Sequence, residues 1–186
     1  ADGCFKWDMA VMCLLFAFGM QICSNLINDL FDYLKGSDRE DRLGPQRACS
    51  QGWLTPKEMK VGIMVSVAIS CAIGLGILYI SIPYVNYKGI ELVAVGVSCV
   101  LFAYLYTSIL SYKGWGDILV IVFFGIVPVC TTYYLQASVV TIPVFLLSLA
   151  CGFAIDALLV INNYRDREQD LISGKRTTVV LYGEKF

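Results

Sequence analysis

The chain has 186 residues, of which 58% are hydrophobic and only 16% are charged, with a net charge of −1 and a mean hydropathy of +0.68. A soluble domain usually carries about 25% charged residues, so this composition excludes an ordinary soluble protein and indicates an integral membrane protein. The chain contains no histidine, which excludes Ser-His and Cys-His catalytic pairs. Its eight cysteines show no CxxC spacing, so we interpret most of them as small buried apolar residues rather than zinc ligands or disulfides.

Long charge-free stretches predict the membrane-spanning helices. No charged residue lies in 9–28, 61–87 or 92–112, and each stretch reaches the roughly 20 residues that a helix needs to cross a bilayer. The apolar run 118–155 is too long for one crossing and contains polar residues and a proline in its middle, so it predicts a hairpin of two helices. The sequence therefore predicts an all-α transmembrane bundle with five spans, near residues 9–28, 61–82, 92–112, 118–135 and 139–161.

The basic residues indicate how these spans are oriented. With five crossings, the segments 29–60, 111–117 and 162–186 lie on the same side of the membrane, and they contain twelve of the fourteen Lys and Arg residues. By the positive-inside rule, we expect this side to face the cytoplasm.

The first polar motif is NLINDLFDYLKGSD, residues 25–38, at the end of the first apolar run. Spacings of three, four and seven residues place four of its oxygen-bearing side chains on one helix face: Asn25, Asn28, Asp29 and Asp32. Ionised groups are costly in hydrocarbon, so carboxylates clustered at a span end require a counter-cation or a function.

The second polar motif is NNYRDREQD, residues 162–170, at the end of the fifth span and on the same side as the first. The same spacing places Asn162, Asn163, Asp166 and Asp170 on one helix face. Magnesium typically binds one or two carboxylates together with water and phosphate oxygens, so two such faces are suited to holding metal ions and a diphosphate. The alternative is that each Asp is a solvated flank of its span, which explains a single Asp more readily than two matched clusters.

Basic residues near both motifs agree with a phosphate site. Arg47 lies in GPQR, and Lys175 and Arg176 lie in GKRT. Guanidinium groups are suited to a bidentate grip on phosphate. Two further residues stay open: Asp156 either faces the cavity under the second motif or pairs with a neighbouring helix, and Tyr106 is either a membrane-interface anchor or part of the pocket.

Taken together, these motifs resemble those of the UbiA superfamily of intramembrane aromatic prenyltransferases, over nearly the whole chain. The segments that carry the resemblance are SNLINDLFDYLKGSDREDRLGPQR, then YT and GWGD, then NNYRDREQDLISGKRTTVVLYGEK. The resemblance implies a bundle of nine transmembrane helices around a central cavity. We expect residues 1–186 to form one membrane prenyltransferase domain that lacks the first and the last few of these helices.

The resemblance also implies roles for individual residues. The family motifs NDxxDxxxD and DxxxD hold two magnesium ions and the prenyl diphosphate, and the third acid of the first motif would fall on Gly36, which makes Asp38 the candidate instead. The implied catalytic and metal-binding residues are Asn28, Asp29, Asp32, Asp38, Asp166 and Asp170; the implied diphosphate ligands are Asn25, Asn28, Arg47, Arg167 and Lys175; and the pocket candidates are Tyr106, Lys113, Asp156 and Asn163.

Within the superfamily the resemblance is strongest to the branch that transfers a polyprenyl group to 1,4-dihydroxy-2-naphthoate with loss of its carboxylate, in menaquinone biosynthesis. It implies Mg²⁺ as cofactor, a polyprenyl diphosphate and the naphthoate as substrates, and a location in the plasma (inner) membrane. We expect the lipid bilayer but no nucleic acid as a partner. The alternatives are another acceptor, such as 4-hydroxybenzoate or a porphyrin, or a cation transporter that uses the same carboxylates.

Overall fold

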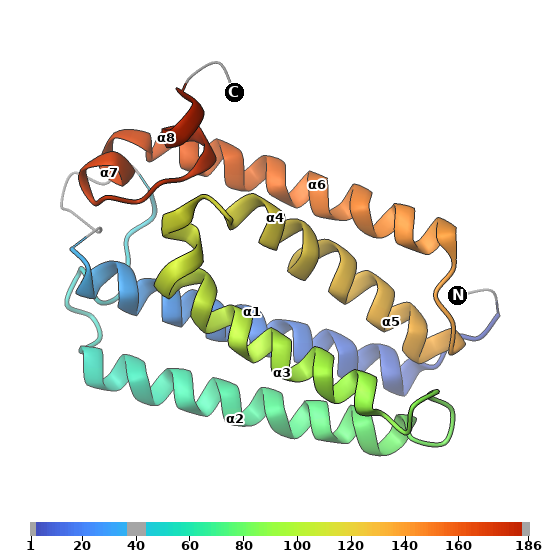
Figure 1. Ribbon diagram of the computed structural model, residues 1–186. Coiled ribbons are helices and arrows are strands. Elements are labelled where there is room, and N and C mark those ends of the chain that lie inside the picture. The colour runs from blue at the N-terminus through green and yellow to red at the C-terminus, as the bar shows by residue number, and fades with distance from the viewer. Residues whose placement is uncertain (1–2, 37–43, 184–186) are drawn as a thin grey trace.

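The computed structural model describes residues 3–36 and 44–183, and within these ranges the regular structure is entirely helical. The predicted all-α class is therefore confirmed. The long helices lie side by side as a bundle (Figure 1). They are α1 (Trp7–Leu34), α2 (Pro56–Ser81), α3 (Ile90–Leu105), α5 (Val127–Ala137) and α6 (Ile142–Arg165). The short helices are α4 (Gly116–Val120), α7 (Arg167–Ile172) and α8 (Thr178–Tyr182).

Four helical segments are long and apolar enough to cross a membrane: α1, α2, the continuous stretch Gly116–Ala137, and α6. The chain is therefore a multi-pass membrane protein. The predicted span at 92–112 differs, because α3 has only 16 residues. Its path is continued by a π-helical turn, Tyr106–Leu110, and a 3-10 turn, Ser111–Lys113. A second π-helical segment, Ile121–Ile126, joins α4 to α5.

Local signals explain where the spans begin and end. At the start of α2, the Thr55 hydroxyl oxygen accepts a hydrogen bond from the Glu58 amide (3.3 Å), and the Glu58 carboxylate accepts one from the Thr55 amide (2.8 Å). This capping box satisfies amides that the first helical turn would otherwise leave unpaired. The predicted hairpin is present. The residue after α5 is Ser138, which has a left-handed conformation (φ 58°), and α6 begins with Pro143 in its first turn.

Many large apolar side chains on the long helices are exposed, as expected where lipid rather than water surrounds a bundle. The buried clusters are small, and one of them, Leu30, Cys49 and Met59, fastens the loop between α1 and α2 to the end of the bundle. None of the eight cysteines, all of which lie in the described ranges, forms a disulfide, and only Cys23 and Cys49 are buried. The expectation that most cysteines are buried is therefore wrong, because several lie on lipid-facing or partly open helix surfaces.

One close approach between two helical segments depends on glycine. A Cβ atom added at Gly125 would lie 2.5 Å from the Ser148 carbonyl oxygen and 2.6 Å from the Cα atom of Gly152. Small residues that let backbones approach closely are a common means of helix association in membranes. This contact holds the segment Ile121–Ile126 against α6.

We expect Gly125→Ala to destabilise the bundle by about 1–3 kcal/mol, because the added methyl group forces α6 away. Gly96→Ala is the matched control, since a Cβ atom at Gly96 meets nothing within 4 Å. The measurement is thermal unfolding of the purified protein in detergent. Equal melting temperatures for the two variants would contradict the packing argument.

Candidate functional site

A polar cavity of about 700 Å³ lies where α1 and α6 end. It is lined by the end of α1, the following loop, the turns between α3 and α4, the end of α6 and the segment before α8. In Figure 1 the ends of α1 and α6 lie at the same end of the bundle, beside α7 and α8. The two polar motifs, at 25–38 and 162–170 in the sequence, therefore meet at one site.

Asp29 of α1 fastens the loop that covers this site. Its Oδ2 accepts a hydrogen bond from the Ala48 amide (2.9 Å), and its Oδ1 accepts one from the Cys49 amide (3.4 Å). The side chain lines the cavity although the residue is only 9% exposed. Asp29 thus combines a structural contact with a position at the cavity wall.

Arg47, from the same loop, neutralises the next carboxylate of α1. Its Nη2 lies 3.1 Å from Oδ2 of Asp32. In the amide orientation that satisfies both partners, the Asn28 carbonyl oxygen also accepts from the guanidinium group at 3.1 and 3.2 Å. Asp32 is only 4% exposed, and its Oδ1 has no hydrogen-bond partner within the described part of the chain. The first motif therefore keeps one carboxylate oxygen buried and available.

The second motif carries its own cations. Arg165 donates to both carboxylate oxygens of Asp166, from Nε and Nη2, each at 2.7 Å. Lys175 Nζ lies 3.8 Å from Oδ1 of Asp170. The prediction of one continuous helical face is wrong in detail, because Asp166 (φ −93°, ψ 6°) separates α6 from α7. The i to i+4 hydrogen bonds continue on both sides of this break, so the acids stay on the same side of the chain.

The predicted site residues take different places. Those that line the cavity are Asn25, Asn28, Asp29, Arg47, Tyr106, Asn163, Asp166 and Lys175. Asp32 and Asp170 are buried and are not part of its lining, and neither are Arg167 and the exposed Lys113. Asp156 is not part of the lining either, and its carboxyl group lies close to that of Asp117 on the neighbouring helix α4. Asp38 lies outside the described residues.

Three residues at this end of the bundle were not assigned a role from the sequence. Asp117 and Arg165 line the cavity. Their positions inside the GWGD and NNYRD segments could have identified them from the sequence. Lys35 follows α1, donates to the Ser108 carbonyl oxygen at 2.8 Å and lies 3.5 Å from the centre of the Tyr112 ring. Burial lowers the pKa of Lys35, and nearby Lys175 lowers it further, while Asp32 acts in the opposite direction.

The donors at this cavity suit a divalent cation that also binds phosphate. Among the described residues, no group of three His, Cys, Asp or Glu side chains is close enough to form a metal site alone. Magnesium needs only one or two carboxylates when phosphate and water supply its other ligands. Asn28, Asp29 and Asp166, which line the cavity, meet this requirement, and Asp32 lies buried next to Arg47 of its lining.

Fold and site together define a multi-pass helical membrane protein with a polar cavity, lined by carboxylates and basic side chains, at one end of its bundle. Residues 1–186 match the UbiA prenyltransferase family, and the chain belongs to that family. Prenyltransferases of this family generally use a divalent metal ion.

Three relatives extend the comparison. The chain is 39% identical to the 1,4-dihydroxy-2-naphthoate octaprenyltransferase of Haemophilus influenzae, over 96% of this chain and 59% of the relative. It is 39% identical to the Escherichia coli enzyme of the same name, over 98% of this chain and 60% of the relative. The corresponding Mycobacterium leprae protein is 33% identical over 96% of this chain and 59% of its own length. The chain thus spans about 60% of the length of these relatives, and no solved structure matches it.

We expect Asp29→Ala to loosen the loop over the cavity, because two backbone amides lose their acceptor, at a cost of about 1–3 kcal/mol. The measurement is amide hydrogen exchange at Ala48 and Cys49, which should become faster. Asn25→Ala, one turn earlier on α1, is the control, since the side-chain oxygen of Asn25 accepts a hydrogen bond from the Gln21 side chain of the same helix. Unchanged exchange at both amides in Asp29→Ala would show that Asp29 does not hold the loop.

Proposed function

We propose that the protein transfers a polyprenyl group from an allylic polyprenyl diphosphate to 1,4-dihydroxy-2-naphthoate, with loss of the naphthoate carboxylate and with Mg²⁺ as cofactor. The observation that carries this proposal is the convergence of both acidic motifs, with their Arg and Lys partners, on one polar cavity. The names of the relatives support the choice of substrates. Because those relatives are longer, the activity is proposed for the chain as part of a protein of their length.

The diphosphate is proposed to bind between the two motifs. Arg47 and Lys175 line the cavity, and each is already close to a carboxylate, Asp32 and Asp170 respectively. A diphosphate that enters exchanges these contacts for charge-assisted hydrogen bonds to its own oxygens. Arg165, which also lines the cavity, offers a guanidinium group that can donate two hydrogen bonds.

The residues proposed to hold the metal ions are Asn28, Asp29, Asp32, Asp166 and Asp170, with Asp38 as a further candidate. A divalent ion bound there supplies charge neutralisation for the departing diphosphate. Asp32 is suited to this role because its buried Oδ1 has no hydrogen-bond partner among the described residues.

The chemistry requires little acid or base catalysis from the protein. The allylic carbon–oxygen bond breaks and its electron pair leaves with the diphosphate; the naphthalene ring then forms a bond to the allylic carbon. Loss of carbon dioxide from the alkylated ring carbon returns an electron pair to the ring. Because no ring proton is removed, a dedicated general base is unnecessary, which agrees with a chain that has no histidine.

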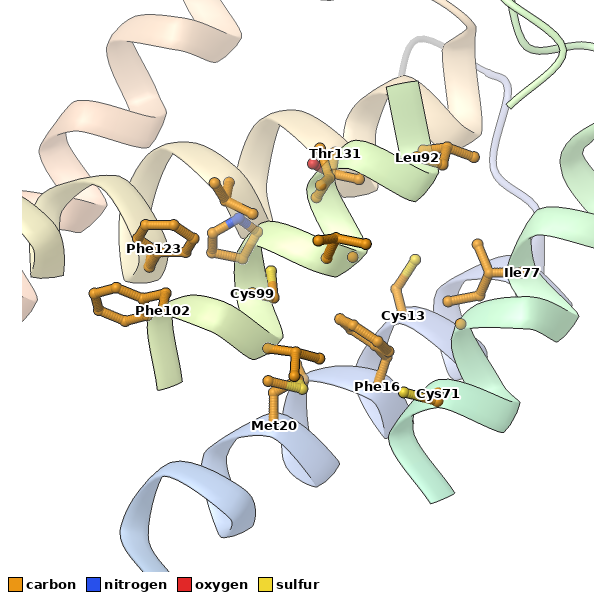
Figure 2. Close-up of a pocket in the computed structure, with 18 of the residues that line it drawn as sticks. Cys13, Phe16, Met20, Cys71, Ile77, Leu92, Cys99, Phe102, Phe123 and Thr131 are labelled. Carbon is orange, nitrogen blue, oxygen red and sulfur yellow. The ribbon is translucent and has the colours of Figure 1, made fainter. Parts of the chain in front are cut away.

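The isoprenoid tail is proposed to occupy a second, apolar cavity of about 640 Å³ inside the bundle (Figure 2). Side chains of α1, α2, α3 and α5 line it, among them Phe16, Met20 and Ile77. Such a cavity also excludes water from the reacting carbon.

We further propose that the membrane is the plasma (inner) membrane, with the polar cavity on the cytoplasmic side. The concentration of twelve of fourteen basic residues on that side supports this orientation. We expect the exposed Cys4, on the opposite side, to react with a membrane-impermeant thiol reagent in intact inner-membrane vesicles only when they are right-side-out. A variant with Cys4 as its only cysteine makes the measurement specific. Labelling of Cys4 in inverted vesicles, and not in right-side-out ones, would reverse the orientation.

We expect Asp32→Ala and Asp166→Ala to reduce prenyl transfer at least about 100-fold while leaving membrane insertion intact, because the diphosphate charge loses its stabilisation. Glu168→Ala is the control, since Glu168 is exposed in the same motif and is not part of the cavity lining. The assay measures transfer by membranes containing the full-length protein. Near-normal activity of either Asp variant would contradict the metal assignment.

The acceptor is tested in the same membranes. We expect turnover with 1,4-dihydroxy-2-naphthoate and release of carbon dioxide in equal amount. Turnover of 4-hydroxybenzoate without turnover of the naphthoate would show that the acceptor is 4-hydroxybenzoate. Magnesium flux through proteoliposomes without any prenyl transfer would show that the protein is a transporter.

A further inference from the structure

Besides α1, two helical segments line both cavities of the bundle. On the first, Phe102 of α3 lines the apolar cavity, and Tyr106, one turn later, lines the polar one. On the second, Asp117 of α4 lines the polar cavity, and Phe123 lines the apolar one. The boundary between the two cavities therefore lies between these positions.

Aromatic rings occupy this boundary. The rings of Phe102 and Phe123 are stacked, with centroids 3.9 Å apart and planes at 5°, and the Phe102 ring lies 5.3 Å from that of Tyr106. Phe102 is only 8% exposed. Figure 2 shows the stacked pair together at one end of the apolar cavity, opposite Leu92 and Ile77.

The backbone of both segments departs from the α-helix at the same level. Tyr106 begins the π-helical turn Tyr106–Leu110, and Phe123 lies inside the π-helical segment Ile121–Ile126. π-helical turns are rare in proteins as a whole, but those that occur often lie at functional sites. The second segment is also held against α6 by the Gly125–Gly152 contact, so Phe123 is presented from a fixed position.

We propose that the stacked Phe102–Phe123 pair is a partition between the two cavities, against which the first isoprene unit of the prenyl diphosphate lies. This rests on the proposed function. With the diphosphate in the polar cavity, a tail that enters the apolar cavity beside α3 and Ile121–Ile126 passes these rings. Flat ring faces suit the flat double bonds of an isoprenoid chain, and the pair keeps the water of the polar cavity away from the apolar one.

The partition predicts a specific side reaction when it is opened. In Phe102→Ala and Phe123→Ala, water from the polar cavity reaches the ionising allylic carbon. A water oxygen then bonds to that carbon, the carbon–oxygen bond to the diphosphate breaks with its electron pair, and one water proton is released to solvent. The product is a prenyl alcohol instead of a prenylated naphthoate.

The experiment measures prenyl alcohol and prenylated naphthoate from geranylgeranyl diphosphate in membranes with the full-length protein. We expect the ratio of alcohol to transfer product to rise about tenfold or more in both Ala variants, and to stay near the unsubstituted value in Phe102→Leu, which keeps an apolar side chain at the boundary. Phe16→Ala is the matched control, because Phe16 lines the apolar cavity on α1. It removes a ring from the tail site without opening the boundary, so KM should rise while the product ratio does not.

The outcomes separate the two proposals. No transfer by the unsubstituted protein with any acceptor would overturn the proposed function. Normal transfer with an unchanged product ratio in both Ala variants, or an equal rise in Phe16→Ala, would overturn the partition alone. Melting temperatures of the variants in detergent show whether a loss of transfer reflects unfolding, and the product ratio is independent of the amount of folded protein.

Discussion

The ion pair between Arg47 and Asp32 is the contact on which this end of the molecule depends. Asp32 is 4% exposed at the end of an apolar helix, where an unpaired carboxylate would cost several kcal/mol. Its cation comes from a loop, and the neighbouring Asp29 holds the same loop by two amide hydrogen bonds. The carboxylates of the first acidic motif thus hold in place the loop that covers them. The polar cavity needs both the carboxylates and the loop.

Each acidic motif carries a cation of its own, and this has a consequence for ligand binding. Arg47 forms an ion pair with Asp32, Arg165 forms one with Asp166, and Lys175 lies near Asp170. Without a ligand the cavity is therefore close to locally neutral. A diphosphate with metal ions adds charge of both signs, so the carboxylates and the basic side chains can each exchange partners without leaving a buried charge unpaired. A cavity with carboxylates alone would bind metal but would repel the diphosphate.

Much of this arrangement was predictable from the sequence, because it follows from charge spacing. Charge-free stretches located the spans and the hairpin at Ser138, and helical offsets grouped Asn28, Asp29 and Asp32. Contacts between distant segments were not predictable. The amide hydrogen bonds to Asp29, the break at Asp166, and the closeness of Asp156 to Asp117 depend on how the helices pack. The π-helical turns likewise leave no pattern in hydropathy, so the span at 92–112 was predicted without them.

The two cavities suggest why the aromatic boundary lies where it does. An allylic diphosphate is charged at one end and apolar along the rest, so the bond that breaks lies where its environment changes. In this bundle that change occurs between Tyr106, which lines the polar cavity, and Phe102, which lines the apolar one. Charge that leaves with the diphosphate stays among the cations, and the carbon left behind lies against rings that exclude water. The order of polar groups, aromatic rings and aliphatic side chains along one helix thus matches the order of head, reacting carbon and tail in the proposed substrate.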